Sequence, residues 1–203
     1  MSRDLAGSGF SECSHQHTSA APSWATRIAD QEIRSCGVAN VYEPQWDADL
    51  DRPPFAWRRA RLGQQAGCEK LGTSLYEIPP GASSFPLHIH QANEELIIVL
   101  SGRPTLRGLD TERELSPGDL VACPAGREGA HRLDNRQSDA VRVLIVSTML
   151  YPEINEYPDS GKVMVRNYPP GGEPPAESLE MILHTDAREA DYFAGETESD
   201  PEG

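Results

Sequence analysis

The sequence predicts an all-β fold, in which residues 71–148 form a small closed or nearly closed barrel. Short runs rich in β-branched and aliphatic residues recur through this region about every 8 to 12 residues. Turn-forming Gly, Pro, Asn or Asp residues separate the runs, as in antiparallel barrels and sandwiches. Apolar residues in this region do not recur with helical spacing. An antiparallel barrel is therefore the simplest architecture that fits the pattern.

Eight strands are predicted, each from an apolar or alternating run that ends at a turn signal. LGTSLYEI stops at PPGASS, FPLHIH stops at QANE, and ELIIVLSG is followed by the short turn before PTLRGL. LDTE precedes REL, SPGD precedes DLVACP, PAGREG precedes AHRLDN, and NRQSD precedes AVRVLIVST. The predicted strands cover residues 71–78, 85–90, 95–102, 104–109, 113–115, 119–124, 130–135 and 140–148.

The segment before the barrel is predicted to be irregular. Residues 1–40 are rich in Ser, Ala, Gly and Gln with few large apolar groups, which predicts a disordered arm. His15 and His17 form an HxH pair there, but no third histidine lies near them, so we interpret them as part of a solvated tail. Residues 43–67 alternate aromatic side chains with prolines and charges, which predicts an irregular arm packed on the barrel. The barrel with this packing segment is thus predicted to span residues 41–150.

The segment after the barrel is predicted to be an extension rather than a second domain. Residues 151–203 are rich in Pro and Tyr, and SLEMILH, at residues 178–184, is the one stretch that could form a short helix. The final residues, AGETESDPEG, are acidic and predict a disordered tail. A chain of 203 residues is long enough for one domain with a real core.

Charge and composition exclude several classes of partner. The chain carries 18 basic and 32 acidic residues, a net charge of −14, which repels nucleic-acid backbones and anionic lipid head groups. No stretch approaches the ~20 consecutive apolar residues of a membrane span, and we predict a cytoplasmic protein. The four cysteines form no CxxC pair and are interpreted as free thiols. The expected partner is therefore a small molecule, not a nucleic acid or a membrane.

Histidines and acidic residues in the predicted strands could bind a metal ion. Residues two apart on a strand point to the same face, so His88 and His90 form a bidentate clamp. The turn after them returns the chain to Glu94 and Glu95, either of which could add a carboxylate. Two histidines and a carboxylate suit Fe, Mn, Co, Ni or Zn and leave open coordination positions. His131 is the only other histidine in the predicted barrel and could join them.

The spacing of these residues resembles the two motif blocks of the cupin superfamily, G-x5-HxH-x3/4-E-x6-G and G-x5-PxG-x2-H-x3-N. The chain has one extra residue before the HxH pair, and four residues instead of two before the histidine of the second block. The six residues that separate Glu95 from Gly102 select Glu95, not Glu94, as the matching carboxylate. The matching residues are Gly81, His88, His90, Glu95 and Gly102 in the first block, and Gly118, Pro124, Gly126, His131 and Asn135 in the second.

The resemblance, which covers residues 71–148, implies a fold, a metal and an assembly. The fold is a double-stranded β-helix, a jelly-roll-like barrel that is usually a homodimer. One divalent transition metal would be held inside the barrel by His88, His90, Glu95 and His131. A barrel whose histidines only pack or form hydrogen bonds is the alternative.

Two functions remain open from the sequence. One is a metal-dependent enzyme, of oxygenase, isomerase or lyase type, acting on a small polar molecule, with Glu94 as a candidate proton handler. The other is a non-catalytic module that binds or senses a small molecule. Tyr76, Arg107 and Arg142 are candidate pocket residues because they lie in predicted strands.

Overall fold

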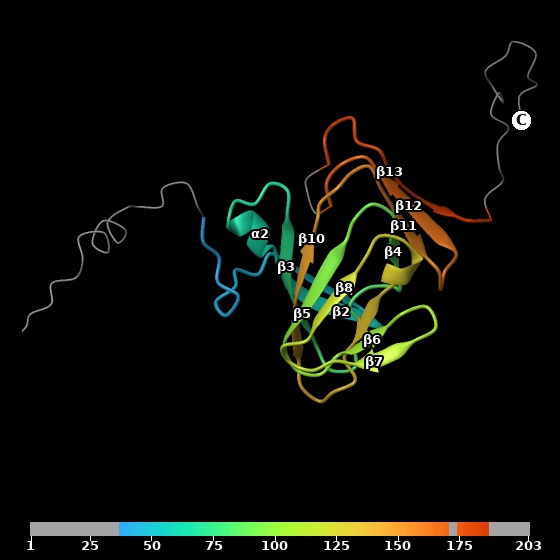
Figure 1. The fold of residues 1–203 in the computed structure, drawn as a ribbon. Coiled ribbons are helices and arrows are strands. Elements are labelled where there is room, and N and C mark those ends of the chain that lie inside the picture. The colour runs from blue at the N-terminus through green and yellow to red at the C-terminus, as the bar shows by residue number, and fades with distance from the viewer. Residues whose placement is uncertain (1–36, 171–173, 187–203) are drawn as a thin grey trace, which may run out of the picture. The chain divides into compact units, whose positions relative to one another are not determined.

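The structure is a computed structural model that describes residues 37–170 and 174–186 (Figure 1). The His15 and His17 pair, most of the predicted N-terminal arm and the acidic tail lie outside the described residues. The described chain is nearly all β, and the predicted fold class is confirmed. None of the helices in this part of the chain has the length and apolar character needed to cross a bilayer.

A six-stranded antiparallel sheet forms one side of the barrel. Its central strand, β10, pairs with β3 on one edge and with β5 on the other, so that Val143 lies opposite both Tyr76 and Val99. Alternate residues of β10 are buried, as the alternating sequence predicts for a strand with one face on the core. In sheet order the strands are β1 (Ala48–Arg52), β2 (Phe55–Ala60), β3 (Gly72–Ile78), β10 (Val141–Ser147), β5 (Glu95–Ser101) and β8 (Leu120–Cys123).

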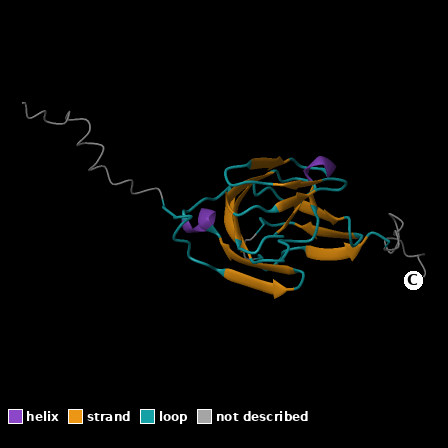
Figure 2. Cartoon of the chain, turned by 90° about the horizontal axis from the view of Figure 1, so that it is seen from below, coloured by secondary structure: helices purple, strands orange, loops and turns teal. Residues whose placement is uncertain are grey.

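Two smaller sheets complete the barrel, and Figure 2 shows the strands curving around a common interior. The four-stranded sheet consists, in order, of β13 (Glu180–His184), β12 (Lys162–Arg166), β11 (Glu153–Tyr157) and β4 (Ile89–His90). The three-stranded sheet consists of β7 (Glu112–Glu114), β6 (Thr105–Arg107) and β9 (Arg132–Asp134). Within the described residues, the helices are α2 (Leu62–Gln65) and the 3₁₀ turn η1 (Arg127–Gly129).

The core lies between the sheets and contains mainly branched aliphatic side chains. Each such side chain stabilises the fold by about 1.5–3 kcal/mol when it leaves water. A second, smaller cluster forms around Leu62 and Leu75, against which Trp46 packs. The fully or almost fully buried members of the main core cluster include Ile78, Ile97, Val99, Leu115, Leu133, Val141 and Val143.

Both flanking segments are more regular than their sequences predict. Within residues 43–67, the chain forms the hairpin of β1 and β2, which extends the six-stranded sheet through pairing of β2 with β3. Pro53 and Pro54 occupy the turn of this hairpin and do not interrupt a strand. The prediction of an irregular arm is therefore wrong for this segment, because the alternating run FAWRRA that follows the prolines forms a strand.

The predicted helix at residues 178–184 is wrong, because the segment forms the edge strand β13. Its residues are good helix formers, but a single short helix is marginal without packing. Pairing with β12, from Lys162 opposite His184 to Arg166 opposite Glu180, satisfies the backbone groups instead. Tertiary context therefore overrides local preference here.

The two extra residues in the second motif block are absorbed by η1. This turn lies between Gly126, whose φ is 90°, and His131, and it folds the insertion against Pro124. The backbone N–H of Gly126 donates to the carbonyl of His90, which ties the turn to β4. The insertion therefore leaves His131 beside the first block.

Gly129 is the tightest point of this turn, and Gly129→Ala is expected to destabilise the protein by about 3 kcal/mol. A Cβ at Gly129 would lie 1.8 Å from the carbonyl oxygen of Pro124, a backbone atom that cannot move alone. Gly118→Ala is the control, because its φ is 92° but nothing lies within 4 Å of the added Cβ, and it should cost about 1 kcal/mol. Urea unfolding of both variants measures the difference, and equal losses would contradict this account of the turn.

Candidate metal centre

His88 and His131 are placed side by side by a backbone bridge between the two motif blocks. The N–H of each residue donates to the carbonyl of the other, at 3.3 and 3.0 Å, and the ring centroids are 4.4 Å apart. Nδ1 of His88 lies 2.9 Å from the carbonyl oxygen of Pro86, and Nδ1 of His131 lies 2.8 Å from that of Gly129. Because a carbonyl only accepts, each Nδ1 carries the proton, and each neutral ring has a lone pair on Nε2.

His90 and Glu95 complete the group from the ends of β4 and β5. Glu95 Oε2 lies 3.1 Å from His131 Nε2, and Glu95 Oε1 lies 3.7 Å from His90 Nε2. One potential ligand atom from each of His88, His90, Glu95 and His131 lies within 4.8 Å of the others. The structure thus brings together all four residues that the sequence proposes as metal ligands, in a group that could hold one ion.

The other predicted site residues are distributed differently. Glu94 is exposed, and its backbone pairs with Thr148. Arg142 forms an ion pair with Glu77 on the neighbouring strand. Of the candidate pocket residues, Tyr76 alone lines the cavity beside the histidines.

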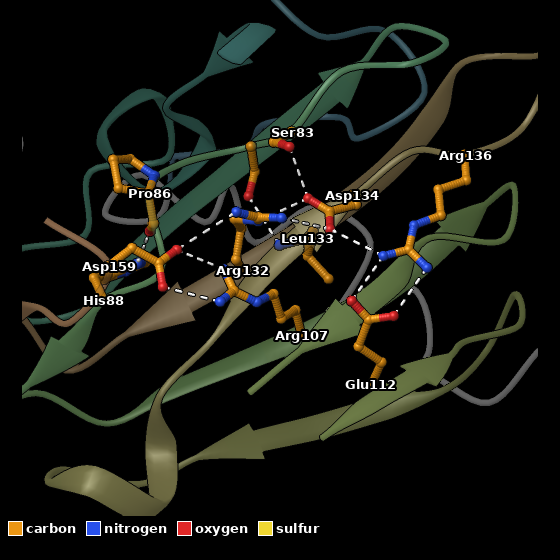
Figure 3. Close-up of polar contacts among 11 residues, drawn as sticks. Ser83, Pro86, His88, Arg107, Glu112, Arg132, Leu133, Asp134, Arg136 and Asp159 are labelled. Carbon is orange, nitrogen blue, oxygen red and sulfur yellow. Dashed lines mark hydrogen bonds and ion pairs between the residues drawn. The ribbon is translucent and has the colours of Figure 1, made fainter. Parts of the chain in front are cut away.

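Arg107 belongs to a separate ion-pair network on the three-stranded sheet (Figure 3). Its guanidinium donates to both carboxylate oxygens of Asp159, at 2.5 and 2.9 Å. Asp134 accepts from Ser83 at 2.7 Å and from Arg132 at 2.8 Å in the same network. These contacts tie β6 and β9 to the loop after β11, and we assign Arg107 a structural role.

Two residues of β11 that hold His90 were missed by the sequence analysis. The side-chain amide of Asn155 lies 2.8 Å from His90 Nδ1, and Glu153 Oε2 lies 3.6 Å from the same atom. Glu153 is fully buried, and its Oε1 accepts from the backbone N–H groups of Gln91 and Ala92, at 3.1 and 3.2 Å. The signal that could have found them is the alternation in EINEY, which places these two polar residues on one face of a strand.

The donor set passes a direct test of whether it fits a cation. In the described part of the chain, His90 Nε2 and Asn155 Oδ1 are buried atoms without a hydrogen-bond partner. Turning the Asn155 amide by half a revolution places Oδ1 against His90 Nδ1, which then carries the proton. His90 Nε2 then has a lone pair like the other two rings. A divalent ion would be the partner that this buried atom lacks.

Electrostatics in the cluster show how strongly it favours a positive charge. Burial, followed by the nearby His131 and His90, lowers the pKa of His88 to about 3. Burial also lowers the pKa of His131, but contacts with Cys123 and Glu95 outweigh it and raise the value to about 10. Burial raises the pKa of Glu95, yet the histidines bring it down to about 2. His131 and Glu95 can therefore share a proton, or the same atoms can bind a metal ion, but the two states exclude each other.

The stability of protein kept free of metal by a chelator should be greatest near pH 6.5. His131 has a folded pKa of about 10, so its contribution is complete below the unfolded value of about 6.5 and is lost as pH rises toward 10. His88 has a folded pKa of about 3, so its contribution is present above pH 6.5 and is lost as pH falls. Thermal unfolding between pH 5 and 9 tests this. A midpoint that rises steadily to pH 9 would contradict it.

The cluster opens into a cavity of about 450 Å³. Its wall includes His88, His90 and Glu95, so ligand atoms of the candidate centre border the open space. The cavity size falls in the range of small-molecule sites, which is about 300–1,000 Å³. Apolar groups on the wall include Phe85, Ile145 and Met164, and polar groups include Tyr76, Tyr157, Arg59, Arg61 and Arg166.

Comparisons with known proteins agree with the fold. The family described as Cupin domain matches residues 74–147. A protein from Acidithiobacillus ferrooxidans, provisionally described as a sugar phosphate isomerase, is 25% identical, with a TM-score of 0.60 over 82% of this chain and 94% of that one. A sugar phosphate isomerase of the cupin superfamily from Silicibacter pomeroyi is 23% identical, with a TM-score of 0.61 over 75% and 96%. The comparison with curated proteins found no match.

Proposed function

Because residues 74–147 place this chain in the cupin superfamily, we propose that it is a metal-dependent isomerase of a sugar phosphate. The observation that carries the proposal is the position of the four-residue group at a cavity that also contains arginines, with three of its members, His88, His90 and Glu95, on the cavity wall. The likeness to the Acidithiobacillus ferrooxidans protein supports the reaction class. Of the oxygenase, isomerase and lyase reactions that the sequence left open, the proposal selects the isomerase.

His88, His90, Glu95 and His131 would hold one divalent ion of Fe, Mn, Ni, Co or Zn. Such an ion supplies Lewis acidity toward a carbonyl or hydroxyl oxygen of the substrate. The remaining groups of the cavity belong to the chain itself. Burial raises the pKa of Tyr76 to about 12 and also raises the pKa of Tyr157. Both hydroxyls stay protonated at neutral pH and can donate hydrogen bonds to substrate oxygens.

Isomerisation assayed in D₂O tests the proposed reaction. Moving a carbonyl between adjacent carbons shifts a C–H hydrogen, either as a proton that can exchange with solvent or as a hydride that cannot, so interconversion of an aldose phosphate and its ketose isomer is the decisive result. NMR of a panel of pentose and hexose phosphates measures interconversion, and deuterium uptake would show a proton-transfer route. His88→Ala is the inactive control, since it removes a proposed ligand. Full metal loading without interconversion of any member of the panel would overturn the isomerase proposal.

A non-catalytic binding module is the second candidate function, and the position of Glu94 favours it. The sequence offers Glu94 as the proton handler, but this side chain is exposed and does not line the cavity. Among the described residues, the carboxylates on the cavity wall are the candidate ligand Glu95 and Glu69. Tight binding of a sugar phosphate without interconversion would support this candidate.

We also propose that the protein is a homodimer, as the resemblance implies, and that it is cytoplasmic, as its sequence predicts. The exposed apolar side chains of β13, among them Met181, Ile182 and Leu183, offer a surface for a second copy. Light scattering after size-exclusion chromatography should give twice the chain mass of 22.2 kDa. A mass of one chain would contradict the dimer.

A further inference from the structure

Arg166 differs from the other arginines of the cavity because its charge is not paired. It lies on β12, between Glu153 of β11 and Glu180 of β13 in the strand register. Both carboxylates are engaged elsewhere: Glu153 accepts from backbone N–H groups, and Glu180 accepts from the Tyr168 hydroxyl. Within residues 37–170 and 174–186, Arg166 makes no ion pair, and its buried Nε has no hydrogen-bond partner.

The arginines contributed by the other sheet are held by an internal carboxylate. Asp47 Oδ1 accepts from Nε and Nη2 of Arg59, at 3.0 and 2.9 Å, and lies 3.4 Å from Nε of Arg61. Asp47 thereby offsets much of the positive charge on that side of the cavity. Arg166 has no such partner, and its guanidinium carbon lies 5.6 Å from the Tyr168 ring centroid. Among the described residues, Arg166 is therefore a cavity arginine whose guanidinium makes no carboxylate contact and still has an N–H donor to offer an anion.

The strand register places Arg166 at a useful distance from the candidate metal centre. His90 lies opposite Asn155, and Asn155 lies opposite Met164, two residues before Arg166. With strands ~5 Å apart and ~3.4 Å per residue, the Cα atoms of His90 and Arg166 are about 12 Å apart. Both side chains border the same cavity. A small molecule could thus contact the metal at one end and the guanidinium at the other.

We propose that Arg166 binds the phosphate group of the substrate while the other end of the sugar reaches the metal centre. This inference rests on the proposed function and names the residue that would recognise the phosphate. A guanidinium offers parallel N–H donors that match two phosphate oxygens, whereas a partly buried guanidinium without an anion is costly. In a chain with a net charge of −14, a local cation is also needed to attract a dianion.

Calorimetric titration of metal-loaded protein tests the inference. Each pentose or hexose phosphate is compared with the same sugar lacking phosphate, and with the corresponding sugar acid. At least one phosphate ester should bind more tightly than its free sugar. Arg166→Met should weaken the binding of that ester by about tenfold or more and leave the affinity for the free sugar unchanged. Arg166→Lys, which keeps the charge but not the paired donors, should recover part of the loss.

Arg113→Met is the matched control, because Arg113 lies on β7, is exposed and does not line the cavity. Bound metal should be the same in all variants, and each variant should unfold in one cooperative transition. An undiminished preference for phosphate in Arg166→Met would overturn the inference, as would the absence of any such preference in the wild type. A preference for sugar acids over phosphates would overturn the phosphate assignment. The isomerase proposal fails separately, through absence of aldose–ketose interconversion in wild-type protein that binds the ester.

Discussion

His131→Ala is expected to reduce affinity for a divalent transition metal by more than about a hundredfold, beyond the 10–100-fold typical of losing an outer contact. The variant removes a ligand and also the partner of Glu95, whose carboxylate lies 3.1 Å from His131 Nε2. Two histidines and one carboxylate remain, with an enlarged gap between the motif blocks. Competition titration against a chromophoric chelator measures the loss for Fe, Mn, Co, Ni and Zn.

Two control variants separate the loss of a ligand from a general effect of substitution. His184→Ala removes an exposed histidine on β13, and should bind metal as the wild type does. Glu94→Gln alters the neighbour of Glu95 and should also retain the metal, whereas Glu95→Gln should not. Retention of full affinity in His131→Ala would show that the ion, if any, is held elsewhere.

Glu153→Ala is expected to destabilise the protein by about 4 kcal/mol and to weaken metal binding by roughly 10–100-fold. Burial raises the pKa of Glu153, but contacts with His90 and the N–H of Ala92 lower it, so the buried group is a carboxylate. Its removal leaves the N–H of Ala92 without its acceptor, and it takes one of two acceptors from the N–H of Gln91 and from the amide of Asn93. His90 keeps Asn155 but loses the carboxylate beside its Nδ1. Urea unfolding of metal-free protein and the chelator competition measure the two effects.

Glu156→Ala is the control on the same strand. Glu156 accepts from the exposed side chain of Gln91, at 2.7 Å, and its removal should change stability by about 0.5 kcal/mol or less. If Glu153→Ala is no more destabilising than Glu156→Ala, Glu153 does not organise the loop before β5. The role assigned to β11 would then be wrong.

The four candidate ligands could be found from sequence because local rules determine their geometry. Strand periodicity places His88 and His90 on one face, and a short turn returns the chain to Glu95. Motif spacing chose Glu95 over Glu94, and the structure places Glu95 in the cluster and Glu94 at the surface. The second block predicted His131 as a candidate ligand in spite of its insertion. The structure places His131 in the cluster because the extra residues form a compact turn.

The contribution of the C-terminal segment could not be predicted in the same way. Pairing of β11 with β4 joins Asn155 to His90 across 65 residues of chain, and no local pattern specifies that partner. The same holds for β13, whose helix-forming residues pair as a strand because β12 has an open edge. Residues that hold a ligand from a distant strand are found only when the topology is known.

We propose that His88, His90, Glu95 and His131 together hold one divalent ion. An anomalous difference map, from crystals of tag-free protein measured at the absorption edge of the bound metal, would locate that ion. A single peak is expected at roughly 2 Å from three Nε2 atoms and one carboxylate oxygen. A map without a peak at these atoms in fully loaded protein, or with its peak at other histidines, would contradict the claim.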